Sequence, residues 1–171
     1  MDRRFLSRGA FGAVLGVATV ASADVTIGWA NLQWPPALNE VVGTPSANVY
    51  GQVWAVGVTD QPGQGAGILA QLGYGPLGEH PTLPSWLWVS MAYNVDVGNN
   101  DEYVGTITPS QVGTFHYTTR FSGDGGANWI YTDLNGPPYE SVNAGVMTVT
   151  PEPGSLALLA GAAMALGRRR R

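Results

Sequence analysis

The densest group of potential metal ligands in the chain lies at residues 96–102, which read Asp-Val-Gly-Asn-Asn-Asp-Glu. Carboxylate and amide oxygens at such short spacing are the ligands that a hard cation such as Ca²⁺ prefers. Asp96, Asp101 and Glu102 are therefore the candidate calcium ligands, and no other cofactor is expected. The spacing differs from that of an EF-hand loop, so a solvated turn between two strands is the alternative interpretation.

Tryptophans form the second chemically suggestive group, because the chain holds six of them. Trp86 and Trp88 alternate with aliphatic residues, which places both indoles on one strand face. Trp54 alternates in the same way with Tyr50 and Gln52. Paired indoles can stack against sugar rings, so Trp54, Trp86 and Trp88 are the candidate carbohydrate-binding residues and a polysaccharide the candidate ligand. The alternative is that the protein's own core or loops cover these rings.

Residues 122–129 read Ser-Gly-Asp-Gly-Gly-Ala-Asn-Trp and match the S-x-D-x-G-x-x-W pattern of an Asp box. In such a turn the Asp124 carboxylate accepts hydrogen bonds from the loop's own backbone amides, and the tryptophan packs under the hairpin. The pattern therefore predicts a folding role for Asp124, with a ligand role as the alternative.

Catalytic arrangements are missing from the sequence. It contains no G-x-S-x-G elbow, no phosphate-binding glycine loop with lysine and no H-E-x-x-H. Asp101 and Glu102 are adjacent, so on a strand they point to opposite sides and cannot flank one glycosidic bond. His80 lies in a proline-rich loop and His116 on a strand face expected to contact water. We therefore expect no catalytic residues and no enzymatic activity.

Composition and charge exclude several classes of protein. The 171 residues include 24 glycines, 12 prolines and no cysteine, which excludes disulfides and thiolate sites. Residues 24–150 hold ten acidic side chains and a single basic one, Arg120, a net charge of about −9. One cation cannot neutralise a run of phosphates, so no nucleic-acid partner is expected.

Short segments rich in Val, Ile, Thr, Tyr and Trp, separated by Gly, Pro, Asn and Asp, predict an all-β domain over residues 24–150. We expect an immunoglobulin-like or fibronectin-like antiparallel β-sandwich of seven to eight strands, flanked by an N-terminal signal helix and a short C-terminal hydrophobic helix. The expected strands span residues 25–32, 48–58, 67–75, 85–95, 102–108, 113–121, 129–134 and 142–150. Alternation predicts that His116 and Arg120 face water and assigns six side chains to the core: Leu87, Val89, Met91, Phe115, Tyr117 and Phe121.

The first 23 residues have the layout of a secretory signal peptide. A basic start is followed by an apolar run and then by Ala21-Ser22-Ala23, in which small residues stand at both positions that a signal peptidase inspects. Ala21 and Ala23 therefore mark the expected cleavage site, and the mature chain is expected to begin at Asp24.

The last 21 residues, 151–171, form a third segment, after the expected signal peptide (1–23) and the β domain (24–150). Pro151, Glu152 and Pro153 precede an apolar stretch over residues 154–167, and Arg168, Arg169, Arg170 and Arg171 follow it. A 14-residue helix reaches ~21 Å, short of the ~30 Å hydrocarbon core of a bilayer. The order of triplet, short helix and arginines resembles the PEP-CTERM sorting signal of Gram-negative bacteria. A simple tail anchor after a proline-rich linker is the alternative.

That resemblance implies recognition of Pro151, Glu152 and Pro153 by an exosortase, a membrane transpeptidase found in organisms that export polysaccharide. It implies export, transient membrane anchoring through the C-terminal helix, and a final location at the cell surface or outside the cell. Residues of about 48–136 also resemble an accessory β-sandwich module of large secreted bacterial proteins, including some starch-degrading enzymes and nucleases. We expect an exported, non-catalytic surface or matrix-associated protein, with a carbohydrate-binding module as the alternative.

Overall fold

The computed structural model describes residues 24–154. The expected signal helix over residues 1–23, its cleavage residues Ala21 and Ala23, and the arginines at 168–171 lie outside the described residues. Pro153 and Gly154, the last two that are described, are helical. Ten strands and one short 3₁₀ helix precede them, which confirms the all-β prediction for this part of the chain.

The strands are short, and glycine- or proline-containing connections separate most of them. Their bounds are β1 Trp29–Trp34, β2 Ala37–Val41, β3 Val49–Trp54, β4 Leu69–Pro76, β5 Leu87–Ser90, β6 Ala92–Val97, β7 Asn100–Gly105, β8 Gly113–Ser122, β9 Ile130–Tyr131 and β10 Gly145–Thr150, with the 3₁₀ helix η1 at Ser141–Asn143.

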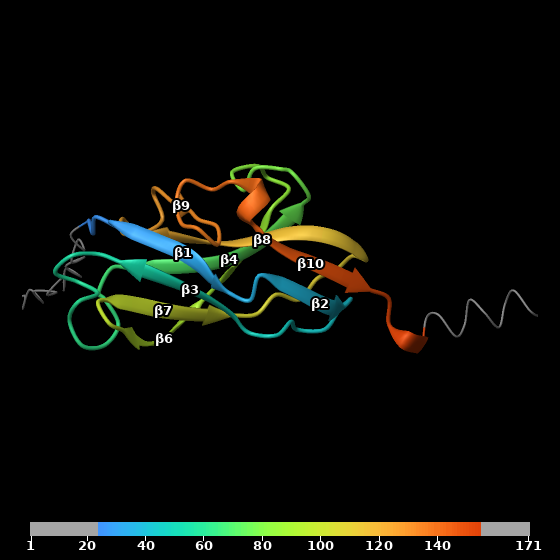
Figure 1. Cartoon of the computed structure of the whole chain (residues 1–171), viewed down its shortest axis with the longest axis horizontal. Helices are drawn as coiled ribbons and strands as arrows, with labels where there is room; N and C mark the ends of the chain where they lie inside the picture. The colour runs from blue at the N-terminus through green and yellow to red at the C-terminus, as the bar shows by residue number, and fades with distance from the viewer. Residues whose placement is uncertain (1–23, 155–171) are drawn as a thin grey trace, which may run out of the picture.

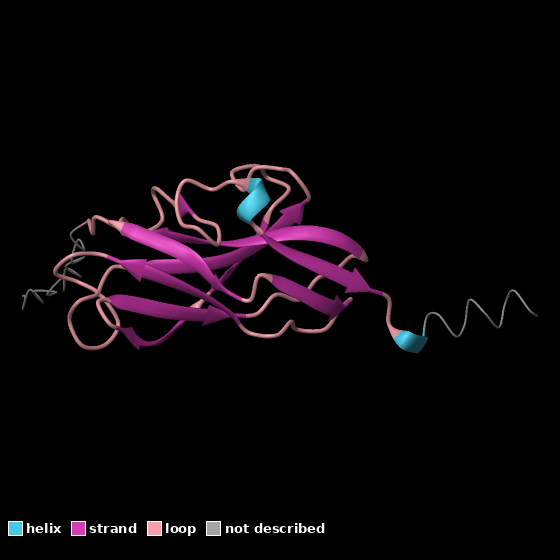
Figure 2. Ribbon diagram, in the orientation of Figure 1, coloured by secondary structure: helices cyan, strands magenta, loops and turns pink. Residues whose placement is uncertain are grey.

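These strands pair into two sheets (Figure 1, Figure 2). Sheet A has the order β1-β3-β7-β6, and all its pairs are antiparallel. Sheet B has the order β2-β10-β8-β4-β5, and β9 adds to β8. Its pairs are also antiparallel except for β2, which runs parallel to β10. Sheet B is therefore mixed.

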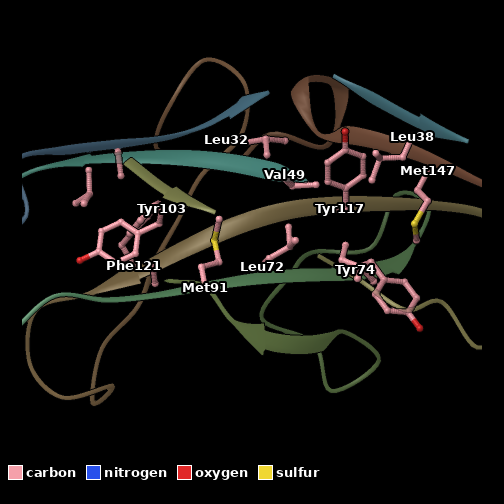
Figure 3. Close-up of a cluster of buried hydrophobic side chains, with 14 of the residues drawn as sticks. Leu32, Leu38, Val49, Leu72, Tyr74, Met91, Tyr103, Tyr117, Phe121 and Met147 are labelled. Carbon is pink, nitrogen blue, oxygen red and sulfur yellow. The ribbon is translucent and has the colours of Figure 1, made fainter. Parts of the chain in front are cut away.

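One hydrophobic core takes side chains from both sheets (Figure 3). Leu32 and Val49 come from sheet A, and Leu72, Tyr117 and Met147 come from sheet B; all five are fully buried. Strand β10 shows how the sequence fills the core from one face of a sheet: its residues alternate strictly between buried and exposed. Alternate side chains of a strand point to opposite faces, so one face of each sheet supplies the core.

The predicted segments agree well with the structure for β3, β4, β8 and β10, whereas those at 25–32 and 102–108 overlap β1 and β7 only in part. The segment at 129–134 is reduced to the two residues of β9, and β2 was not predicted. The largest difference concerns residues 85–95, which were expected to form one strand. They form β5 in sheet B and then β6 in sheet A, and Met91 lies at the crossing, where its backbone N–H donates to the Ala70 carbonyl at 2.9 Å.

This crossing changes the burial expected for that segment. Met91, Tyr117 and Phe121 are buried as predicted, while Phe115 is half-buried. The prediction is wrong for Leu87 and Val89, which are 55% and 41% exposed. They lie on an edge strand whose continuation has left the sheet. Both therefore border an open cleft of about 270 Å³ instead of the core.

The outer faces of the two sheets differ in how closely side chains cover them. Over sheet B, the indole of Trp88 packs on Gly73 and that of Trp86 on Gly75, so closely that a Cβ on either glycine would lie within 2.6 Å of the ring. Glycine is therefore required at both positions of β4. Over sheet A, by contrast, several large side chains of the outer face are exposed, including Trp34 at 59%.

The two ends of the described chain leave the domain at opposite ends of its long axis (Figure 1). Asp24 precedes β1 at one end, where Val25 N–H donates to the Gly123 carbonyl at 2.7 Å. The C-terminal segment leaves β10 at the other end. The length of the domain therefore separates its two points of attachment.

Two leucine truncations test this assignment of core and edge. Leu72 is fully buried, so Leu72→Ala is expected to lower the free energy of unfolding by about 2–5 kcal/mol through lost burial and the remaining cavity. Leu87→Ala removes the same atoms from an exposed site and is expected to cost less than about 1 kcal/mol. Urea unfolding followed by circular dichroism measures both, and equal losses would contradict the placement of β5.

Candidate functional site

Four side chains stack in a column over the outer face of sheet B. The rings of Trp86 and Trp88 have centroids 5.7 Å apart and an interplanar angle of 21°. The Arg120 guanidinium then lies 4.1 Å from the Trp88 ring centroid and 4.2 Å from that of Trp129. A cation between two indole faces is attracted to both. We call Trp86, Trp88, Arg120 and Trp129 the aromatic column.

Hydrogen bonds hold the guanidinium of the aromatic column in place. Its Nε and Nη2 donate to Gln71 Oε1 at 2.9 and 2.5 Å, and its Nη1 donates to the Tyr131 hydroxyl at 3.3 Å. Arg120 is therefore half-buried and does not face open water, contrary to the expectation from strand alternation. Alternation identified the correct face of β8 but could not show that β5, β9 and their connections cover it.

The pair Trp86 and Trp88 does not form an open platform for sugar rings. Trp86 is only 4% exposed, with Trp88 stacked against it and Tyr139 packed edge-on. Trp88 has Trp86 against its ring and the Arg120 guanidinium over it. The structure therefore agrees with the alternative interpretation, in which the protein's own side chains cover these two rings. The binding surface proposed for them is occupied by the protein's own side chains.

Trp54, the third candidate tryptophan, lies on the outer face of sheet A. On β3 it alternates with Tyr50 and Gln52, while the residues between them enter the core. Across the pairing with β1, Trp34 stands opposite Tyr50 and Asn31 opposite Gln52. The indole of Trp54 packs across Gly28 and is half-buried. Aromatic rings therefore lie at both ends of a row of amides.

Polar groups on strands β3, β7 and β6 continue this surface. Asn100 Nδ2 donates to Gln52 Oε1 at 3.1 Å, and Asn94 Nδ2 donates to Glu102 Oε1 at 2.6 Å. These bonds hold the polar side chains in place, and Gln52 and Glu102 are themselves buried, at 8% and 9% exposure. We call the following residues the sheet A face: Asn31, Trp34, Tyr50, Gln52, Trp54, Asn94, Asn100 and Glu102.

Three members of the sheet A face, Asn31, Trp34 and Asn94, were missed by sequence reasoning. A tryptophan next to two prolines carries no strand signal of its own. Its placement depends on the register between β1 and β3, which shifts between Leu32 and Trp34. Nothing local in the sequence indicates that shift.

The turn at residues 122–129 has the expected internal bonding. Asp124 Oδ1 accepts from the Asn128 backbone N–H at 2.9 Å and from the Ser122 hydroxyl at 2.7 Å. Its Oδ2 accepts from the Asn128 side-chain amide at 2.6 Å. Bonds from Asn128 and then Ser122 lower the pKa of Asp124 to about 2. All these partners lie within the turn, which fits the predicted folding role.

The three candidate calcium ligands do not converge. Asp96 and Asp101 stand opposite each other in the β6–β7 pair, so their side chains share a face. Glu102 follows Asp101 on the same strand and points to the sheet A face. Within residues 24–154, no three or more His, Asp or Glu side chains are grouped so that they could hold a metal ion.

The two histidines have separate structural contacts. The Gly78 N–H donates to His116 Nδ1 at 3.4 Å, and burial lowers the pKa of His116. The ring of His80 packs edge-on against Tyr139, with centroids 5.4 Å apart. Among the described residues neither has a carboxylate hydrogen-bond partner; His80 Nδ1 lies 2.9 Å from the Thr82 hydroxyl within its own loop, without a carboxylate to orient the ring.

The Pro-Glu-Pro triplet comes directly after the last strand. Pro151 is half-buried, whereas Glu152 and Pro153 are exposed. The Glu152 carboxylate lies beside Gly43 in the β2–β3 connection. The triplet is therefore accessible and held close to one end of the domain.

Residues 149–171 match the PEP-CTERM protein-sorting motif. This confirms the resemblance seen in the tail, and the motif implies export and processing by an exosortase. No helix in the described part of the chain is both long and apolar enough to cross a membrane.

The central region is similar to parts of amylopullulanases. The chain is 37% identical over 142 residues to the amylopullulanase of Thermoanaerobacter thermohydrosulfuricus, covering 73% of this chain and 9% of that enzyme. It is 33% identical over 130 residues to that of Thermoanaerobacterium thermosulfurigenes, covering 66% and 7%. The chain thus spans about a tenth or less of the length of these curated relatives. No solved structure matches it.

A substitution of Arg120 tests whether stacking in the aromatic column stabilises the domain. Arg120→Lys keeps the charge but replaces the flat guanidinium by an ammonium that cannot fill the space between two indoles. We expect a loss of about 1–2 kcal/mol in the free energy of unfolding, together with a weaker near-ultraviolet circular dichroism signal from tryptophan. Urea unfolding at neutral pH measures the first. An unchanged midpoint and spectrum would show that charge alone, and not the stack, is needed.

Proposed function

We propose that this chain is an exported, non-catalytic surface protein that is sorted through its C-terminal tail. The observation that carries the proposal is the sorting motif, whose Pro-Glu-Pro triplet follows directly on β10 with Glu152 and Pro153 exposed. A motif placed there can be reached by a membrane enzyme without unfolding the domain. After processing, the domain remains at the cell surface or is released.

The domain itself acts as a structural module in this proposal. Its ends lie at opposite ends of the long axis, as suits a unit that spaces its neighbours. The similarity to a small part of much longer enzymes supports the same role, since the matching region makes up only about a tenth of each of them. The side chains of Asp101 and Glu102 lie on opposite faces of β7, so they cannot act on one bond together. Both histidines make structural contacts. These arrangements support the absence of catalysis in this proposal.

We further propose that the two sheets form an immunoglobulin-like sandwich. In that fold the strands follow the order A-B-E-D in one sheet and G-F-C, extended by C′, in the other. The order β1-β3-β7-β6 corresponds to the first and β10-β8-β4-β5 to the second. Strand β2, parallel to β10, then continues strand A into the second sheet after Pro35 and Pro36.

Sorting is tested by changing the triplet. Glu152→Gln removes the only charge of the Pro-Glu-Pro motif, and we expect the variant to keep its C-terminal segment in a host that carries an exosortase. Intact-mass measurement of the exported protein shows whether residues up to Arg171 remain. The matched control is Glu140→Gln, an exposed acid outside the motif, which is expected to be processed normally. Normal processing of Glu152→Gln would contradict the role given to the triplet.

A second candidate function is carbohydrate binding by the sheet A face. Two observations favour it: Trp34, which is exposed, and the half-buried Tyr50 and Trp54 lie around amides that hydrogen bonds hold in place, and the relatives are named amylopullulanases, which connects the module to glucans. Planar rings stack on sugars while amides bind hydroxyls. The negative charge of about −9 favours a neutral glycan over an acidic one.

The test is a titration of the full-length protein with pullulan and amylopectin, followed by tryptophan fluorescence. Each stacked ring contributes about 1 kcal/mol, so we expect weak binding that Trp34→Ala or Trp54→Ala reduces by about fivefold to tenfold. Trp88→Phe is the matched control, because Trp88 lies in the aromatic column, and it is expected to retain binding. An unaltered affinity in both alanine variants would exclude the sheet A face as the binding surface.

A further inference from the structure

One buried oxygen atom of β7, Asp101 Oδ1, has no hydrogen-bond partner among the described residues. The Tyr103 hydroxyl on the same face lies near the Gln64 side chain of the β3–β4 connection; burial raises the Tyr103 pKa, and this contact lowers it. Asp101 is 0% exposed and Tyr103 is 1% exposed. The two residues are two positions apart on one strand, so both side chains point to the core side of sheet A. In Figure 3 the Tyr103 hydroxyl lies at the margin of the hydrophobic cluster and points away from it.

A second carboxylate faces this position. Asp96 stands directly opposite Asp101 in the antiparallel pair of β6 and β7. Like charges at such positions destabilise a sheet, and an unpaired buried carboxylate costs far more than an exposed one. Burial, and then the charge of Asp96, raise the pKa of Asp101. The pair therefore lacks a positive charge.

The protein supplies no such charge within residues 24–154. Arg120 is the one basic residue of this part, and its guanidinium is held in the aromatic column. What the chain does supply are backbone donors: Gly65 N–H to Asp101 Oδ2 at 2.7 Å and Gly63 N–H to Asp96 Oδ2 at 2.9 Å. The glycine-rich β3–β4 connection, residues 55–68, thus lies against both carboxylates.

We propose that Asp96 and Asp101 bind a calcium ion beneath the β3–β4 connection. The ion neutralises both carboxylates and takes the free Asp101 Oδ1 as a ligand. With two carboxylates from the chain, the remaining ligands are neutral oxygens, from backbone carbonyls, amides or water, and calcium accepts such mixed sets readily. Zinc does not suit the position, since the chain has no cysteine and both histidines are engaged elsewhere.

Glu102 takes no part in this site, although the sequence placed it with the other two acids. Its side chain lies on the opposite face of β7, where Asn94 Nδ2 donates to it. Tyr93 belongs with the site, because its hydroxyl donates to Asp96 Oδ1 at 2.5 Å. Two tyrosines, Tyr93 and Tyr103, are therefore close enough to excite a luminescent lanthanide bound between the aspartates.

Terbium titration of the full-length protein, after removal of metals with EDTA, provides the test. Tb³⁺ replaces Ca²⁺ at oxygen sites, and excitation of tyrosine and tryptophan at 280 nm is expected to give saturable terbium emission that Ca²⁺ displaces. Calcium at a hundredfold excess over its Kd is expected to raise the melting temperature by about 8 °C. Asp101→Asn is expected to weaken Tb³⁺ binding by about tenfold or more.

Glu102→Gln is the matched control, since it removes the neighbouring charge on the other face and is expected to leave terbium affinity unchanged. If Asp101→Asn fails to fold, Asp96→Asn carries the same expectation. A water molecule that donates to Asp101 Oδ1 would satisfy this atom without a metal. In that case neither terbium emission nor a calcium-dependent melting shift appears, and the proposal is wrong. It is equally wrong if Glu102→Gln loses binding while Asp96→Asn retains it.

Discussion

The position of the Arg120 guanidinium between Trp88 and Trp129 determines which surfaces of the domain are open. It fixes an indole from β5 and one from the turn after β8 over the same part of sheet B. Trp86, Tyr131 and Tyr139 then pack around them and form a second, smaller cluster outside the main core. This layer covers the aromatic side chains of sheet B, whereas on sheet A Trp34 is exposed and Tyr50 and Trp54 are half-buried.

Arg120 is the single arginine of residues 24–154, which contain no lysine, and its place in the aromatic column affects the acids of the domain. Carboxylates in this part of the chain accept hydrogen bonds from backbone and side-chain donors of glycine-rich or polar turns. Asp124 accepts from Asn128, and Asp133 accepts from the backbone N–H groups of Asn135 and Glu140 at 2.7 and 2.8 Å. Charge-assisted bonds of this kind stabilise an ionised carboxylate well. Asp101 departs from this pattern because one of its buried oxygens has no donor.

The surfaces of the domain lie at different places along its long axis relative to the sorting tail. The triplet and the β2–β3 connection lie at the end from which the tail leaves (Figure 1). The β3–β4 connection, which donates hydrogen bonds to Asp96 and Asp101, lies at the other end. A chain held by its tail therefore presents the β3–β4 connection away from the point of attachment. The sheet A face runs along the side of the domain, so attachment leaves both regions accessible.

The sequence by itself determined the sorting motif, the all-β class and most strand positions, because these depend on local order and on the two-residue period of a strand. It also identified that Trp86, just before β5, and Trp88, on β5, share one face. Only the tertiary structure decided that loops cover this face, that Leu87 and Val89 are exposed, and that Trp34 joins Tyr50 across a shifted register. Alternation tells which residues share a side, whereas burial depends on segments far away in the chain that pack against that side.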